Sequence, residues 1–276
     1  MFANLGVKVY IVEALQHILP FIDKDLALAI KQYLLKKNVT IYENIFVNKI
    51  EINKGGIKAI LSNNERIEVD KVLIAIGRMP KTSGIGLKNV FVETDQHGFI
   101  KVNERYQTSN PRIYSAGDVI GQPLLAHKAL LESIAVAKNI AGEEIFKLNY
   151  TLIPLTIFSG LEIASIGYTE KELKNKNIKY RRIRLPIYFL SSVKIKNGRY
   201  SFIKILLDEE SSRVYGIHIV APNASEIISA YLPLYMGKIE LEEIARTPYP
   251  HLTVSESLRE IAEYILGEPI HIFLKK

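Results

Sequence analysis

Short β-branched runs and one amphipathic segment alternate over the first quarter of the chain. Residues 7–12 have the length and composition of a buried strand. Asp23, a favourable N-cap residue, precedes apolar residues at helical spacing. A short strand is predicted at 39–42, an antiparallel meander at 47–69 and another buried strand at 72–76. This alternation of strands and helices predicts an α/β fold.

The middle of the chain, after Pro80, has fewer periodic segments. Residues 113–116 form a short apolar run, which predicts a strand that leads into Gly117 and Asp118. A helix is predicted to begin near Ala126. Its apolar residues recur at helical spacing: Leu130, Leu131, Ile134, Ala137 and Ile140. We therefore expect a second α/β segment here.

From about Tyr150 onward, strands and helices are grouped instead of alternating. Apolar runs at 201–207 and 214–219 flank a polar turn and predict a hairpin, followed by helices at 224–235 and 240–245. Two capping-box patterns mark the starts of further helices: Thr169 with Glu172, and Thr253 with Glu256. Grouped elements are typical of an α+β unit. The predicted fold class is therefore α/β followed by α+β.

Composition narrows the class of protein. The 276 residues are 48% hydrophobic and 24% charged, which excludes a wholly disordered, collagenous or coiled-coil chain. No apolar run approaches the ~20 residues that span a bilayer, so no membrane partner is expected. The net charge of +7 arises from lysines interleaved with acidic residues, without stacking aromatics, so no nucleic-acid partner is expected. These features predict a cytoplasmic protein.

The sequence contains no cysteine. This excludes disulfides, thiolate metal sites, iron–sulfur clusters and a cysteine nucleophile within the chain, and it is compatible with a reducing compartment. Four histidines lack the spacing of metal ligands: His17, His97, His218 and His271. We expect structural roles for them and no metal site.

Five short motifs follow one another in an order known from one protein family. They lie at 76–82, 94–119, 125–129, 216–226 and 251–256. The first resembles a G-R-x-P-N-T stretch, and the second contains P-R-I-Y-S-A-G-D, which is similar to a flavin-binding T…P-x-I-Y-A-x-G-D signature. On these motifs the chain resembles the pyridine nucleotide-disulphide oxidoreductases, most closely the dihydrolipoamide dehydrogenases.

The resemblance implies a division into three domains. Residues 1–79 would be a partial NAD-binding domain, residues 80–147 the C-terminal part of an FAD-binding domain, and residues 148–276 an α+β dimerisation domain. Both nucleotide-binding domains would be incomplete Rossmann-like folds. The family's two glycine-rich fingerprints and its redox-active cysteine pair precede the matching region. We therefore expect the C-terminal part of such an enzyme, which forms a homodimer and needs the missing half from a separate chain or an upstream continuation.

Three residues are candidates for NAD binding. Glu13 ends a strand that would be the second of a βαβ unit, where a carboxylate can accept hydrogen bonds from an adenosine ribose and repel a 2′-phosphate. The resemblance puts Val47 against the adenine and Gly77 near the nicotinamide. Gly77 also lacks a Cβ, which allows close approach of a ligand to the backbone. The alternatives are a solvated acid at Glu13 and an ordinary turn at Gly77.

Five residues are candidates for FAD binding. Asp118 follows a predicted strand and a glycine, at the edge where open α/β sheets bind ligands, and could accept a hydrogen bond from the ribityl chain. Leu124, Leu125, Ala126 and His127 would direct the first amides of a helix toward the isoalloxazine ring, and the positive end of the helix dipole would stabilise a reduced flavin. The alternatives are an ordinary turn aspartate and a packing or capping histidine.

His251 and Glu256 are the candidate catalytic pair. An imidazole titrates near neutral pH, and a carboxylate partner fixes its tautomer. The resemblance implies that His251 accepts the proton of a dithiol substrate in the active site of the partner subunit. The alternative is structural, because Glu256 also fits the capping box. Leu252 replaces the family's usual proline and Tyr249 replaces another histidine, and P-H-L-T also resembles mercuric reductases, which end in a cysteine pair that this chain lacks.

The function expected from the resemblance is that of a dihydrolipoamide dehydrogenase-like flavoprotein. The intact reaction passes two electrons from a dithiol, through a disulfide and FAD, to NAD. Without cysteine, this chain alone cannot carry out the dithiol step. Two alternatives stay open: a non-catalytic dimerising module, and a mercuric reductase-like or NADH diaphorase-type flavin oxidoreductase.

Overall fold

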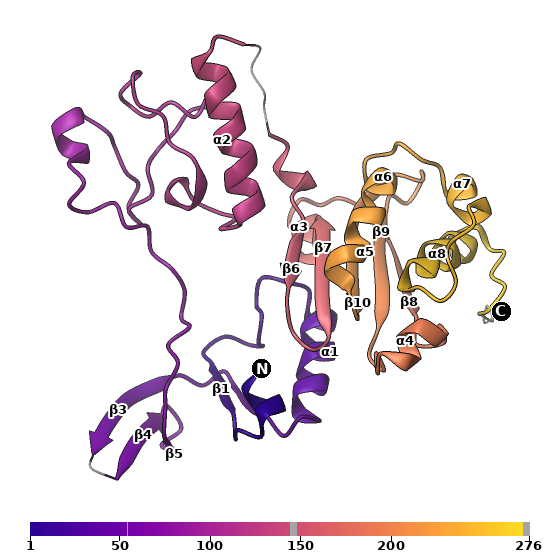
Figure 1. The fold of residues 1–276 in the computed structure, drawn as a ribbon, viewed down its shortest axis with the longest axis horizontal. Coiled ribbons are helices and arrows are strands. Elements are labelled where there is room, and N and C mark those ends of the chain that lie inside the picture. The colour runs from indigo at the N-terminus through magenta and orange to yellow at the C-terminus, as the bar shows by residue number, and fades with distance from the viewer. Residues whose placement is uncertain (54, 144–147, 273–276) are drawn as a thin grey trace. The chain divides into compact units, whose positions relative to one another are not determined.

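The computed structural model describes residues 1–53, 55–143 and 148–272. The chain forms two compact units (Figure 1). The first unit joins Met1–Val72 to Pro154–Lys276, and the second is Leu73–Ile153. None of the helices in the described residues is long and apolar enough to cross a membrane.

The N-terminal segment of the first unit contains two small sheets. Its elements are η1 (Phe2–Leu5), β1 (Tyr10–Glu13), α1 (Lys24–Leu35), β2 (Thr40–Glu43), β3 (Val47–Asn53), β4 (Gly56–Leu61) and β5 (Arg66–Val69). Strands β1 and β2 pair in parallel, and β3, β4 and β5 form an antiparallel sheet. The predicted βαβ unit and meander are therefore confirmed, with Asp23 as the N-cap of α1.

The C-terminal segment of the first unit is a five-stranded antiparallel sheet with helices. The strands are β6 (Leu155–Ile157), β7 (Glu162–Gly167), β8 (Arg181–Pro186), β9 (Phe202–Leu207) and β10 (Val214–Ala221). The helical elements are α3 (Glu170–Asn175), α4 (Ser191–Ile195), α5 (Ala224–Ala230), α6 (Leu232–Tyr235), α7 (Leu241–Arg246), η5 (Val254–Glu256) and α8 (Ser257–Leu266). The strand order is β6-β7-β10-β9-β8. The predicted hairpin and the α+β character are confirmed, although Pro233 at the start of α6 divides the helix predicted at 224–235.

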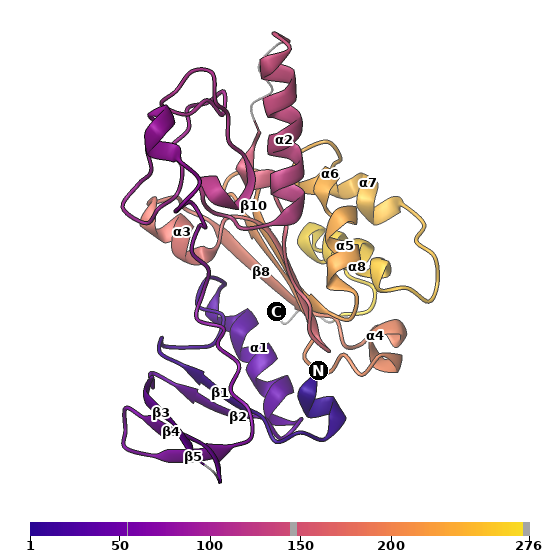
Figure 2. The same ribbon diagram turned by 60° about the vertical axis from the view of Figure 1, so that its left-hand side comes forward.

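Both faces of this sheet are covered, as Figure 2 shows. Residues of α5, α7 and α8 pack on one face around Ile203 and Ile205, whereas α1 packs on the other around Phe202. Because side chains alternate along a strand, Lys204 shares the face of Phe202 and is directed toward α1. The core of the first unit therefore joins the start of the chain to its C-terminal half.

The second unit has little regular structure besides one long helix. Its elements are η2 (Leu87–Val90), η3 (Gly117–Ile120), α2 (Ala126–Ile140) and η4 (Tyr150–Leu152). The helix predicted from Ala126 is confirmed. The strand predicted at 113–116 is wrong, because only an isolated bridge between Gln107 and Tyr114 forms there.

The strand predicted at 72–76 is also wrong. The segment has no regular structure, and Leu73, Ile74 and Ile76 are exposed, Ile76 to 94%. A buried parallel strand needs hydrogen-bonded neighbours and covered faces. In the described part of the chain no strand pairs with this segment, so its apolar composition does not produce one.

Candidate functional site

His251 and Glu256 lie side by side just before α8. The Nδ1 atom of His251 is 2.8 Å from Oε1 of Glu256, and the imidazole is 73% exposed. The other carboxylate oxygen of Glu256 accepts a hydrogen bond from the backbone N–H of Thr253 at 3.0 Å. Glu256 therefore takes part in both interactions considered from the sequence, the cap and the pair with His251.

This geometry sets the chemistry that the pair can perform. A carboxylate accepts the proton on Nδ1, so Nε2 carries the free lone pair of the neutral ring. Nε2 of His251 can accept a proton from a substrate, and Glu256 then stabilises the imidazolium. The structure thus brings together the two residues predicted as a catalytic pair.

The turn that contains Asp118 lies against α2. Gly117 has φ +82°, and a Cβ at this position would meet the Cβ of Ala129 at 3.3 Å, so a side chain would be strained and crowded here. Asp118 is exposed in η3, directly after Gly117. The turn therefore presents a carboxylate at its surface.

The N-terminus of α2 lies a few residues further on. Leu124 and Leu125 are half-buried, Ala126 and His127 are exposed, and the N-cap residue Leu125 makes no side-chain cap. Backbone N–H groups in the first turn of an α-helix have no acceptor within the helix itself, and the helix dipole favours an electron-rich ligand there. Together with Asp118, these donors fit the polar atoms of a flavin nucleotide.

The candidate NAD residues are divided between the two units. Glu13 and Val47 belong to the first unit, whereas Gly77 belongs to the second. Oε1 of Glu13 accepts the backbone N–H of Leu15 at 2.9 Å, which holds the carboxylate at the end of β1. Val47 is exposed at the start of β3, and Gly77 has φ +124° with open space around it. A carboxylate at the end of a parallel strand fits a ribose.

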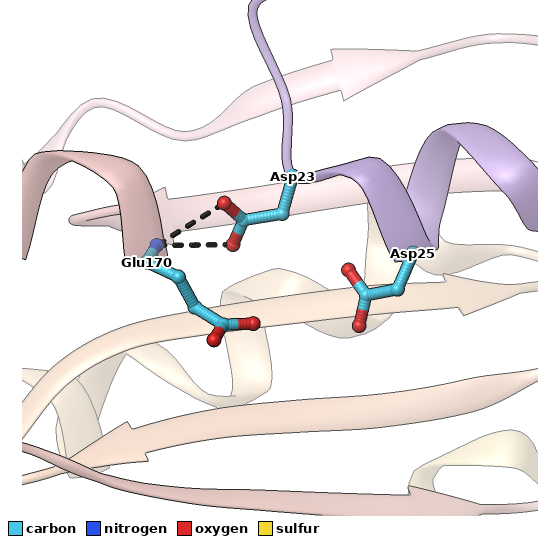
Figure 3. A group of neighbouring side chains, drawn as sticks. All are labelled: Asp23, Asp25 and Glu170. Carbon is cyan, nitrogen blue, oxygen red and sulfur yellow. Dashed lines mark hydrogen bonds between the residues drawn. The ribbon is translucent and has the colours of Figure 1, made fainter. Parts of the chain in front are cut away.

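Sequence reasoning missed a buried charge cluster in the first unit. Figure 3 shows that Asp23, Asp25 and Glu170 direct their carboxylates toward one point. Nζ of Lys204, which is fully buried on β9, lies 2.8 Å from Asp23, 2.7 Å from Asp25 and 3.1 Å from Glu170. These carboxylates could otherwise hold a metal ion, but the ammonium group of Lys204 lies within 3.1 Å of all three of them. The sequence signal was a lone lysine within the apolar run F-I-K-I-L-L.

The cluster changes the titration of its neighbours. Burial alone would raise the pKa values of Asp23 and Glu170, but hydrogen bonds and charge attraction from Lys204 outweigh it and lower both. Burial, together with repulsion from Lys204, lowers the pKa of His218 to about 4. His218 is hydrogen-bonded to Ser165 and to the carbonyl oxygen of Tyr168, so its role is structural, as predicted.

Two models of one protein family match this chain. Residues 1–133 match the family model described as pyridine nucleotide-disulphide oxidoreductase. Residues 153–262 match the dimerisation domain of the same family. The chain belongs to the pyridine nucleotide-disulphide oxidoreductase family. The five-stranded sheet and helices α3–α8 lie within or next to its dimerisation domain, and β1–β5 lie within the first match.

Members of this family that are similar to the chain include two dihydrolipoyl dehydrogenases. The mitochondrial dihydrolipoyl dehydrogenase 1 of Arabidopsis thaliana is 34% identical over 99% of this chain and 54% of its own length. The dihydrolipoyl dehydrogenase of Thermus scotoductus is also 34% identical, over 99% of this chain and 60% of its own. The chain thus spans about 54–60% of the length of these relatives.

Two solved structures are similar to this chain. LpdA from Mycobacterium tuberculosis matches with a TM-score of 0.87 and 27% identity, over 96% of this chain and 57% of its own. The flavoprotein disulfide reductase RclA from Escherichia coli matches with a TM-score of 0.88 at 24% identity, over 96% of this chain and 61% of its own. The second likeness concerns the fold alone.

Proposed function

We propose that this chain is the part of a dihydrolipoyl dehydrogenase-like flavoprotein that carries the dimerisation domain and the proton-accepting His251. The observation that carries the proposal is the 2.8 Å contact between Nδ1 of His251 and Glu256, which leaves Nε2 as a base at the surface. The names of the 34%-identical relatives support the reaction class. In the intact reaction, dihydrolipoamide and NAD⁺ give lipoamide, NADH and one proton.

The residues of this chain would bind the cofactors and move the proton. When bound, FAD and NAD supply the transfer of the electron pair from the dithiol. Asp118 and the segment of Leu124, Leu125, Ala126 and His127 at the N-terminus of α2 would hold the flavin. Nε2 of His251 would take the thiol proton. The chain has no cysteine, so the disulfide must come from a polypeptide outside this sequence.

Glu13, Val47 and Gly77 would bind NAD in the same assembly. The exclusion of a 2′-phosphate by the Glu13 carboxylate supports NAD over NADP.

We also propose domain boundaries after residues 79 and 147, the second of which lies outside the described residues, together with a homodimer and a cytoplasmic location. The match to a dimerisation domain supports the homodimer, and the absence of cysteine is compatible with a reducing compartment.

The test is purification of the tagged chain from the organism that encodes it, with every polypeptide that binds to it. We expect a yellow preparation that reduces NAD⁺ with dihydrolipoamide. The variant His251→Gln should lower kcat about 100-fold or more. His271→Gln is the matched control, because His271 also lies 2.8 Å from a glutamate, Glu260. Equal activity of wild type and His251→Gln would refute the role of His251.

A second candidate function is that of a non-catalytic dimerising module. The count of zero cysteine favours it, because no dithiol step can occur within this chain. The same purification separates the two candidates. A colourless dimer that binds neither flavin nor a cysteine-containing polypeptide would support the module. Flavin with NADH oxidation, but without dihydrolipoamide activity, would indicate a diaphorase-type oxidoreductase.

A further inference from the structure

Helix α2 buries two charged residues, Lys128 and Glu132, and exposes many of its apolar ones. Lys128 is 1% exposed and Glu132 is fully buried, whereas Leu130 and Ile140 are exposed. Burial of an ammonium and a carboxylate costs several kcal/mol each unless both are paired and hydrogen-bonded. The compensation comes from the turn that contains Asp118.

Lys128 and Glu132 bond to both ends of that turn. Nζ of Lys128 donates to the carbonyl oxygens of Gly117 at 3.1 Å and Gly121 at 2.9 Å, and lies 3.1 Å from Oε1 of Glu132. Oε2 of Glu132 accepts the backbone N–H of Gly117 at 2.7 Å. All three protons of the ammonium group are therefore directed at acceptors, and Gly117 is held through both its N–H and its C=O.

A tyrosine completes the network around Glu132. The hydroxyl of Tyr150 donates to Oε1 of Glu132 at 2.6 Å, and the hydroxyl of Tyr106 lies 3.4 Å from that of Tyr150. Burial and the bond to Glu132 raise the pKa of Tyr150, so it remains a donor. Oε1 of Glu132 is thus held by Tyr150 and Lys128, and Oε2 is held by the backbone N–H of Gly117.

We propose that Lys128 and Glu132 are positioning residues for flavin binding, which hold Gly117 and Gly121 so that Asp118 is presented beside the N-terminus of α2. The inference rests on the proposed function, because it assumes that this turn binds the flavin. Neither residue would touch the cofactor. A merely structural pair would stabilise the unit without changing affinity for the flavin.

The experiment compares a charge-neutral double variant with a surface control. Lys128→Met with Glu132→Met removes every bond that these two side chains make to the turn without leaving one buried charge unpaired, so the chain is expected to fold. Glu132→Gln alone is the second variant, because it keeps an acceptor for Gly117 but loses the charge. Lys138→Met is the matched control, since Lys138 lies on the same helix and pairs with Glu143 at the surface.

The first measurement needs no flavin. Hydrogen exchange of the Gly117 amide, resolved by NMR on the full chain, should accelerate at least tenfold in the double variant. The amide of Ala135, in the middle of α2, should change less than twofold in the same variant. Unchanged exchange at Gly117 would overturn the proposal, because the turn would then be held by other contacts.

The second measurement is the FAD dissociation constant of the purified assembly, followed by flavin fluorescence. We expect at least a tenfold weaker affinity for the double variant, an intermediate loss for Glu132→Gln, and no change for Lys138→Met. Faster exchange at Gly117 with unchanged FAD affinity would overturn the positioning role while leaving the proposed function intact. A wild type that binds no FAD in any preparation would overturn both, and the exchange data would still show whether the pair holds the turn.

Discussion

Replacement of Lys204 by methionine tests how the buried charge cluster stabilises the first unit. The substitution keeps the volume of the side chain but removes the ammonium group from between Asp23, Asp25 and Glu170. Loss of one partner from a buried ion pair costs about 3–5 kcal/mol. We expect the free energy of unfolding to fall by about 3 kcal/mol at pH 7, the lower end of that range. Two arginines compensate in part, because Arg184 lies 3.9 Å from Asp25 and Arg182 lies 3.7 Å from Glu170.

The pH dependence of this variant should have the opposite sign to that of the wild type. In the wild type the pKa values of Asp23 and Glu170 are lowered, so their stabilising contribution is present above about pH 4 and is lost as the pH falls through the lower folded-state values. Without Lys204, burial and mutual repulsion raise the folded-state values above the unfolded ones. These carboxylates then bind more protons in the folded variant than in the unfolded chain, so the destabilisation relative to wild type decreases between pH 7 and pH 5.

The assay is urea unfolding followed by far-ultraviolet circular dichroism at pH 7 and pH 5. The destabilisation caused by Lys204→Met relative to wild type should be smaller at pH 5, because a proton on a carboxylate or on His218 replaces the lost charge. Lys58→Met is the control, because Lys58 pairs with Glu68 near the surface, and should cost less than about 1 kcal/mol at both pH values. A cost for Lys204→Met below about 1 kcal/mol, or an equal cost at pH 5 and pH 7, would show that the ammonium group of Lys204 does not stabilise the cluster.

Three further predictions concern single residues. Burial lowers the pKa of His218 from 6.5 to about 4, so the unfolded chain binds a proton at this residue before the folded chain does. The free energy of unfolding of the wild type should therefore fall by up to about 3 kcal/mol between pH 6.5 and pH 4. His218→Gln should remove this pH dependence in urea titrations. Gly117→Ala should destabilise the second unit by about 1–2 kcal/mol in thermal unfolding, because of the positive φ and the contact with Ala129, and an unchanged Tm would contradict this. Glu256→Ala should cost about 1 kcal/mol through loss of the bond to Thr253 and should also lower the activity of the assembly, whereas Glu256→Gln should retain most of the stability.

The sequence predicted those elements whose apolar residues pack within the chain itself. The runs that became β9 and β10 alternate between two covered faces, and Asp23 marks the start of α1. The run at 72–76 has the same composition as a buried strand, yet it is exposed, because no strand of the described residues pairs with it. The composition of a segment therefore indicates which secondary structure it favours, but a strand forms only where neighbouring strands can pair with it.

The candidate site was partly predictable for a similar reason. His251 and Glu256 are five residues apart, so a local pattern could bring them together. Lys204 lies 181 residues from Asp23 along the chain, and no periodicity links them. On α2, the regular spacing of apolar residues drew attention to Leu130 and Ile140, although these are exposed and two of the buried residues, Lys128 and Glu132, are charged.

The two buried lysines follow one principle in separate parts of the chain. Lys128 bonds to backbone carbonyls of a turn and to one carboxylate, whereas Lys204 bonds to three carboxylates at the starts of two helices. In both places a buried ammonium group links the start of a helix to a neighbouring segment of the chain. Apolar packing can bury such segments but cannot set their orientation, because it is not directional. We conclude that Lys128 sets the local geometry of the turn that contains Asp118, and that Lys204 sets the geometry where α1 meets the sheet.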